Sequence, residues 1–219
     1  MVKTIKISQA RPRQTQMNDA VTVLKNSGII AHATETVYGL ATVWDDWPAI
    51  QRLSKLKQRG LGQPYSMLVS SIAEIIELIG WESAQLHHLL ENIFPGPITI
   101  LLPRKRLLRP TFWNQFTELG FRLPRHAVST GLEKSVGKPL ITTSANIKNM
   151  PPPRSVREIS SAITQHIDCI LDSGECQIQI PSTIIKVNFT EQNFLIIREG
   201  AFKESALVGI LKKLSLKKL

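Results

Sequence analysis

Strand-like and helix-like segments alternate irregularly along the chain, and this order limits the folds that it can adopt. Short apolar runs of strand length are separated by segments with apolar residues at helical spacing. The predicted strands cover residues 3–7, 29–34, 65–69, 98–102, 120–124, 140–143, 169–171, 182–187 and 194–197. The predicted helices cover residues 18–27, 46–59, 71–79, 83–93, 127–136, 156–166 and 204–214. Because strict strand–helix–strand repetition is absent, the pattern predicts an α/β or α+β domain with a mixed, twisted sheet and flanking helices.

Local signals indicate where several of these helices begin and end. We expect Asn18 or Asp19 to begin the first helix. Ser71 and Glu74 have the spacing of a capping box, and Gly80 follows the last apolar residue of that helix.

The length of 219 residues predicts one domain with a short basic tail. The family resemblance given below places the domain at residues 1–201 and the C-terminal helix and basic tail at residues 202–219. No run of about 18 apolar residues is present, so we expect no membrane span. The N-terminus lacks the apolar core of a signal peptide. Cys169 and Cys176 have no partners at metal-ligand spacing, which predicts reduced thiols in a cytoplasmic protein.

The net charge of +10 is the outlier in the composition, and part of it is concentrated in two places. One cluster contains Arg104, Lys105, Arg106 and Arg109, and the C-terminal tail contains Lys212, Lys213, Lys217 and Lys218. Such charge favours an anionic partner, either nucleic acid or a polyphosphate. Charge runs are also typical of a solvated surface without a partner.

The stretch His32-Ala33-Thr34-Glu35-Thr36-Val37-Tyr38-Gly39-Leu40 places two hydroxyls, a carboxylate and a phenol within five residues. If it continues the preceding strand, Thr34, Thr36 and Tyr38 share one face and Glu35 points to the other. A hydroxyl-lined face of this kind belongs either to a binding cavity or to an edge strand with a solvated face. The pattern alone does not choose between the two. If the face belongs to a cavity, Glu35 points away from it unless the strand twists or bulges.

Cations and small polar groups also gather at predicted element ends. Lys57 and Arg59 end a helix just before Gly60, where they suit the helix dipole and could equally clamp phosphates. Ser144-Ala145-Asn146 follows a strand directly, and Arg122 alternates with apolar neighbours. The sequence contains no Walker-type loop, no dinucleotide fingerprint and no histidine at zinc-ligand spacing. What remains is a set of groups suited to a nucleotide and a small polar substrate.

Seven motifs of this chain occur in the order found in one family. They are Thr34-Glu35-Thr36-Val37-Tyr38-Gly39-Leu40, Lys57-Gln58-Arg59, Phe94-Pro95-Gly96-Pro97-Ile98-Thr99, Phe121-Arg122-Leu123-Pro124, Ser144-Ala145-Asn146, Pro181-Ser182-Thr183-Ile184-Ile185, and Arg198 with Gly200. On these motifs the chain resembles the YrdC-like family of threonylcarbamoyl-AMP synthases over residues 17–201, in its short, single-domain form. The resemblance implies an α/β fold in which a twisted, mostly seven-stranded mixed sheet and flanking helices surround a large concave cavity.

The resemblance also implies an activity. The family's enzymes are nucleotidyltransferases that convert L-threonine, bicarbonate and ATP into L-threonylcarbamoyladenylate and pyrophosphate. The product feeds threonylcarbamoyladenosine (t6A) formation in tRNA, where partner proteins of the pathway make the final transfer. Mg²⁺ is expected to arrive on the ATP phosphates, with no metal site of the protein's own, and a direct contact with tRNA is left open.

The resemblance assigns roles to individual residues. The threonine would be held by Thr36, Arg122 and Ser182, with Arg122 pairing its carboxylate. Lys57 and Arg59 would clamp the phosphates, and the ATP site would be completed by Gln63, Thr142, Ser144, Asn146 and Arg198. This chain departs from the family at Leu68, where many members carry a histidine near the threonine, and at Pro152, where a serine often reaches the nucleotide.

Two other readings remain. One is a non-catalytic RNA-binding module of the same fold, for which Phe112 and Trp113 would supply stacking beside the basic cluster. The other is the carbamoyl-transfer domain used in hydrogenase maturation, which resembles this fold. Those proteins carry cysteine-rich zinc modules and an acylphosphatase domain, and this sequence contains neither.

Overall fold

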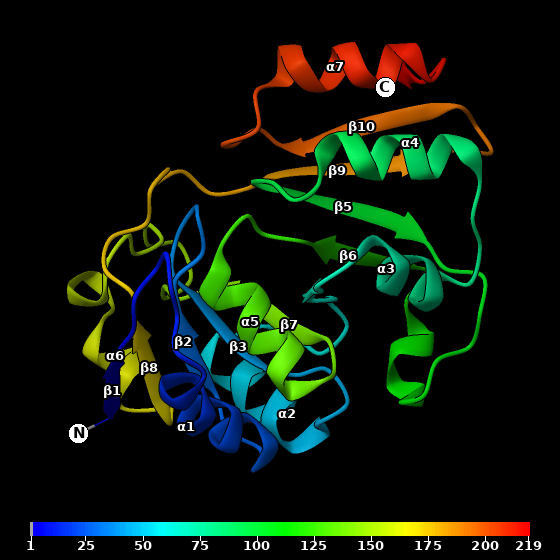
Figure 1. Ribbon diagram of the computed structural model, residues 1–219. Helices are drawn as coiled ribbons and strands as arrows, with labels where there is room; N and C mark the ends of the chain where they lie inside the picture. The colour runs from blue at the N-terminus through cyan, green and yellow to red at the C-terminus, as the bar shows by residue number, and fades with distance from the viewer. Residues whose placement is uncertain (1) are drawn as a thin grey trace.

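One eleven-stranded sheet runs through the computed structural model, which describes residues 2–219 (Figure 1). Its strands lie in the order β1-β8-β2-β3-β7-β4-β6-β5-β9-β10-β11, with parallel and antiparallel neighbours. The strands are β1 (Lys3–Lys6), β2 (Ile30–His32), β3 (Gly39–Val43), β4 (Ser66–Leu68), β5 (Ile98–Pro103), β6 (Glu118–Arg122), β7 (Leu140–Ser144), β8 (Cys169–Asp172), β9 (Thr183–Asn188), β10 (Asn193–Arg198) and β11 (Lys217–Lys218). The mixed sheet is confirmed. The number of strands exceeds both the nine predicted from the sequence pattern and the seven implied by the resemblance, and β3 and β11 lie where no strand was predicted.

The helices pack against this sheet with their apolar stripes. They are α1 (Gln14–Lys25), α2 (Trp47–Leu56), α3 (Ile72–Ile79), α4 (Ala84–Ile93), α5 (Ala127–Val136), α6 (Ser161–Thr164) and α7 (Glu204–Lys213). The predicted signals around α3 are confirmed: the Ser71 hydroxyl accepts a hydrogen bond from the Glu74 N–H at 3.2 Å, and Gly80 ends the helix with φ of 73°.

Two predicted helices are wrong in their bounds. Helix α1 begins at Gln14 and not at Asn18, because burial of Met17 extends the apolar stripe by one turn. The segment predicted as one helix over 156–166 is divided into a 3₁₀ turn, Val156–Glu158, and α6. Ile159 has an extended backbone between them and is buried in the core, so its burial interrupts the helix.

Neighbouring strand ends bring distant parts of the sequence together. The end of β6 lies beside the start of β5, and β5 pairs in parallel with β9 from Ile98 and Thr183 onward. The end of β10 returns antiparallel to the start of β9. On the other side, Gly39 at the start of β3 pairs with Ser144 at the end of β7. These ends position the site described below.

The C-terminal residues continue the sheet. Helix α7 contacts α4 and has Leu207 and Leu211 buried. Strand β11 then pairs in parallel with β10. The Lys218 ammonium forms an ion pair with Glu204. Among the helices of residues 2–219, none is long and apolar enough to cross a membrane.

Candidate functional site

A cleft of about 810 Å³ opens over the middle of the sheet. Eight of the ten residues assigned to the site by resemblance line it: Arg59, Gln63, Arg122, Thr142, Ser144, Asn146, Ser182 and Arg198. The lining includes three guanidinium groups and several hydroxyls but no Asp or Glu. A cleft of this composition is suited to a ligand with more than one negative charge.

The stretch after β2 is a tight turn, and the predicted continuation of the strand is wrong. The Thr34 hydroxyl donates to the Val37 carbonyl at 2.8 Å and lies 3.2 Å from the N–H groups of Thr36 and Val37. Local hydroxyl-to-backbone bonds of this kind compete with strand pairing. As a result the period-2 alternation does not apply. Tyr38 is buried and donates its hydroxyl to the Gly174 carbonyl at 2.7 Å, and it also belongs to the cleft lining, whereas Thr34 and Thr36 do not.

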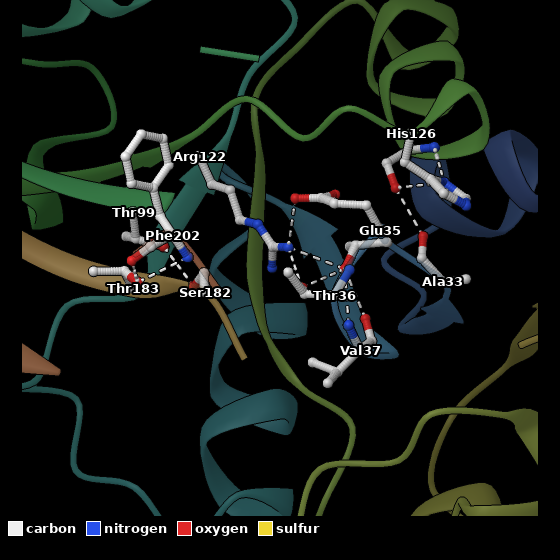
Figure 2. A network of polar contacts seen from close by, with 12 residues as sticks. Ala33, Glu35, Thr36, Val37, Thr99, Arg122, His126, Ser182, Thr183 and Phe202 are labelled. Atoms are coloured by element: carbon white, nitrogen blue, oxygen red, sulfur yellow. Dashed lines mark hydrogen bonds and ion pairs between the residues drawn. The ribbon is translucent and has the colours of Figure 1, made fainter. Parts of the chain in front are cut away.

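Arg122, at the end of β6, is held by this turn (Figure 2). Its Nη2 donates to the hydroxyl of Thr34 at 3.0 Å, to the hydroxyl of Thr36 and to Glu35 Oε1 at 3.2 Å. The prediction that Glu35 points away from the site is therefore wrong, because its carboxylate forms a buried ion pair with Arg122. The three acceptors orient the guanidinium and leave Nη1 to a ligand in the cleft.

Ser182, which directly precedes β9, connects β5 to β10. Its hydroxyl lies 3.0 Å from the Thr99 hydroxyl of β5, and Arg198 donates to its carbonyl from Nε at 3.1 Å and from Nη2 at 2.6 Å. Next to it, Thr183 donates to the Phe202 carbonyl at 2.7 Å and accepts from the Gly200 N–H at 3.0 Å. This network fixes Arg198 to the start of β9. Figure 2 shows its Thr99, Ser182 and Thr183 members as a group separate from the contacts of Arg122.

Lys57 supports the cleft from behind and is not part of its lining. Its ammonium donates to the Ser144 carbonyl at 2.8 Å, to the Asn146 carbonyl and to Asn146 Oδ1 at 3.1 Å. Burial and the neighbouring Arg59 lower the pKa of Lys57 to about 8. In this arrangement Lys57 orients the turn at the end of β7.

Arg59 lies in the cleft with its guanidinium 4.6 Å above the ring of Tyr65. Its Nη2 donates to the Pro64 carbonyl, and its buried Nε has no partner among the described residues. The cation–π contact and the single backbone acceptor orient the group without neutralising it. Its charge is therefore available to an anion.

A buried polar cluster lies behind the turn. The Ser129 hydroxyl of α5 donates to the Ala33 carbonyl at 2.8 Å, and His32 Nδ1 donates to the same carbonyl at 3.1 Å. His126 Nδ1 accepts from the Ser129 N–H at 3.4 Å and so caps α5. Burial lowers the pKa of His32 to about 3 and that of His126 to about 4, so both rings are neutral near pH 7. The cluster fixes the chain where it enters the turn.

Some residues of this site were absent from the sequence prediction. Thr99 belongs to a quoted motif but had no assigned role. Thr34 was placed on the cavity face without a predicted contact to Arg122, and Glu35 was placed on the wrong face. Thr99 could have been predicted from the sequence, because it lies near the start of a predicted strand, just after the Gly96-Pro97 turn. The basic cluster around Arg104 lies outside the cleft lining. The guanidinium of Arg104 donates from Nη2 to the carbonyls of Asn114 at 3.1 Å and Phe116 at 3.2 Å.

The two departures from the family pattern lie in different settings. Leu68 is fully buried at the end of β4, whereas Pro152 lines the cleft. No group of three or more His, Cys, Asp or Glu side chains within residues 2–219 could hold a metal ion.

Comparisons with known proteins agree with this geometry. The chain matches the Sua5/YciO/YrdC family, described as telomere recombination, over residues 22–200. It is 28% identical over 188 residues to the threonylcarbamoyl-AMP synthase of Photobacterium profundum, covering 84% of this chain and 98% of the relative. It is 27% identical over 190 residues to that of Pyrococcus abyssi, covering 87% of this chain and 55% of the relative, so the chain spans about half of that protein.

A solved structure has the same fold. The crystal structure of P. abyssi Sua5 complexed with L-threonine superimposes with a TM-score of 0.86 at 22% identity, covering 100% of this chain and 62% of that one.

Proposed function

The chain belongs to the Sua5/YciO/YrdC family, and we propose that it is a threonylcarbamoyl-AMP synthase that acts in tRNA t6A modification. Its substrates are L-threonine, bicarbonate and ATP, and its products are L-threonylcarbamoyladenylate and pyrophosphate. The observation that carries the proposal is the position of Arg122. Its guanidinium lines a cleft that also contains Arg59 and Arg198, and three acceptors of one turn hold it.

The reaction needs positioned charge more than a strong nucleophile. The threonine amine combines with bicarbonate to give a carbamate and water. A carbamate oxygen then forms a bond to the α-phosphorus of ATP, and the bond from that phosphorus to the bridging oxygen breaks, so that pyrophosphate leaves with the electron pair. Transfers of this kind depend mainly on alignment and on stabilisation of the developing charge.

The residues of the cleft supply both requirements. Arg122 binds the threonine carboxylate, with the hydroxyls of Thr36 and Ser182 beside it. Arg59 binds the phosphates, and its position over Tyr65 limits its motion. Lys57 orients the turn of Ser144 and Asn146, so that these side chains face the nucleotide. Gln63, Thr142 and Arg198 complete the ATP site from the surrounding walls.

Mg²⁺ enters this proposal only as part of the ATP complex. The cleft lining offers hydroxyl and amide oxygens but no carboxylate, so these residues do not form the ligand set that a protein-held Mg²⁺ requires. The protein's own cations act directly on the phosphates. The pathway's transfer proteins and tRNA consume the product, and the free, buried thiols of Cys169 and Cys176 support a cytoplasmic location.

The direct test is pyrophosphate release from ATP. We expect release that requires both L-threonine and bicarbonate, and we expect Arg122→Gln to raise the KM for threonine while leaving ATP binding in place. Arg52→Gln is the matched control, because Arg52 pairs with Asp168 outside the cleft. Circular dichroism verifies that both variants are folded. Release that is independent of threonine or of bicarbonate contradicts the proposal.

A further inference from the structure

A second cavity of about 330 Å³ lies beside the cleft and shares none of its lining residues. We name it the side pocket and define it by Glu35, Glu91, Phe94, Arg125, Ile178 and Phe202. None of the roles assigned above uses this cavity. Its position matters because Glu35 also belongs to the turn that holds Arg122.

The Glu35–Arg122 ion pair separates the two cavities. Arg122 lines the cleft, Glu35 lines the side pocket, and 3.2 Å separate Arg122 Nη2 from Glu35 Oε1. Figure 2 shows one carboxylate oxygen of Glu35 facing Arg122 and the other on the far side. That second oxygen, Oε2, is buried and has no hydrogen-bond partner among the described residues, and Glu35 is only 3% exposed. A buried carboxylate oxygen without a donor is costly, so it favours any N–H or O–H group that reaches it. Because Oε2 has almost no exposed surface, a ligand in the side pocket reaches it only after a shift of the Glu35 side chain.

The rest of the side pocket offers complementary groups. Arg125 and Glu91 are exposed at its rim, and Arg125 Nη2 donates to the Pro95 carbonyl at 3.3 Å, which holds the guanidinium there. Phe94, Ile178 and Phe202 provide apolar walls. An occupant that satisfies all of these groups has an ammonium group for the carboxylates, a carboxylate for Arg125 and a small aliphatic body.

We propose that the side pocket is a second binding site for a free α-amino acid, coupled to the cleft through Glu35. An ammonium group at Glu35 Oε2 competes with Arg122 for the charge of the shared carboxylate. Glu35 then neutralises Arg122 less, while Thr34 and Thr36 still hold its Nη2, so Nη1 attracts a carboxylate in the cleft more strongly. An amino acid in the side pocket therefore strengthens binding in the cleft, and the coupling is reciprocal. The coupling to threonine rests on the proposed function, whereas binding in the side pocket does not.

The test is equilibrium dialysis of the full chain against radiolabelled L-threonine and, separately, L-valine, both without ATP. We expect wild type to bind two molecules of threonine per chain. Arg125→Gln removes the carboxylate partner at the rim, and Ile178→Trp fills the cavity, so each variant should bind one. Threonine in the remaining site should bind about fivefold more weakly or worse, because the coupling is lost. Arg122→Gln should retain the site in the side pocket, for valine as well as threonine, and Arg52→Gln should behave as wild type.

Two results would overturn the proposal. One is a single wild-type site that disappears in Arg122→Gln, and the other is two sites that persist in both Arg125→Gln and Ile178→Trp. Pyrophosphate release, measured on the same preparations, judges the proposed function separately. Two binding sites without pyrophosphate release contradict only the proposed synthase activity. One binding site with normal pyrophosphate release contradicts only the proposed amino-acid site in the side pocket.

Discussion

The buried His126 should make the folded state less stable on acidification, and replacing it should remove a measurable part of that loss. Burial, followed by the nearby charge of Arg122, lowers the pKa of folded His126 to about 4, whereas the ordinary value is 6.5. Between these two pH values the unfolded chain binds a proton that the folded chain does not. The free energy of unfolding is therefore highest above pH 6.5 and falls as the pH drops toward 4.

The magnitude follows from the two pKa values. From pH 7 to pH 5 the unfolded imidazole gains most of a proton, and the folded one gains about a tenth of one. Integrating this difference gives a loss of about 2 kcal/mol from His126 alone. His32 has a pKa of about 3 and adds a similar loss. Glu133 acts in the opposite sense, because burial raises its pKa to about 7 and its folded form keeps a proton in this range.

A single substitution isolates the His126 contribution. In His126→Asn the new side chain can still accept from the Ser129 N–H as an N-cap, and it does not titrate. Urea unfolding of both proteins at pH 7 and pH 5 gives each protein's loss on acidification. We expect the loss to be about 2 kcal/mol smaller in the variant, or smaller still, because His126 also lowers the pKa of His32 and its removal reduces the His32 loss as well. The contribution of Glu133 cancels in the comparison. His166→Asn, at an exposed position, should keep the wild-type loss. Equal losses in wild type and His126→Asn would refute the reasoning.

Three further predictions concern the site and its supports. Arg59→Ala should weaken ATP binding at least tenfold in calorimetry, because it removes a cation that binds the phosphates. The Tm should change little, because the half-buried guanidinium makes only one backbone hydrogen bond. An unchanged ATP affinity contradicts the role of Arg59. Ser129→Ala should cost about 1 kcal/mol in urea unfolding and raise the KM for threonine, whereas Thr130→Ala, whose hydroxyl contacts only its own helix, should leave that KM unchanged. Gly200→Ala should lower the free energy of unfolding in urea by about 1–3 kcal/mol, because its Cβ would lie 2.2 Å from the Pro181 carbonyl oxygen. Gly209→Ala should raise that free energy by about 1 kcal/mol, because Gly209 lies on α7 with open space around it.

Local signals predicted the fold well where neighbours in sequence decide the structure. The capping box before α3 and the glycine that ends it act within one helical turn, so they can be recognised without the rest of the chain. The start of α1 was missed because packing of Met17 against the fold, and not a cap, decides it. The strand β3 was missed because its five residues are all buried, so no polar alternation marks it.

The candidate site was predictable in its residue types but not in its geometry. The family resemblance identified the arginines, hydroxyls and amides, and eight of the ten assigned residues line one cleft. The prediction failed at Glu35 because it assumed a strand where the Thr34 hydroxyl binds the backbone and makes a turn. Lys57 was expected to contact phosphates, and that remains a prediction; in the structure its ammonium is engaged by Ser144 and Asn146.

By itself the sequence determined the family, the mixed sheet with flanking helices, and the set of groups available for chemistry. These depend on apolar periodicity and on motifs a few residues long. Only the tertiary structure decided which acceptors hold Arg122, because Thr34 and Thr36 reach it across 88 and 86 residues of chain. It also placed a buried carboxylate between two cavities. Contacts over that separation depend on strand order and on the path of one turn, and neither follows from local patterns.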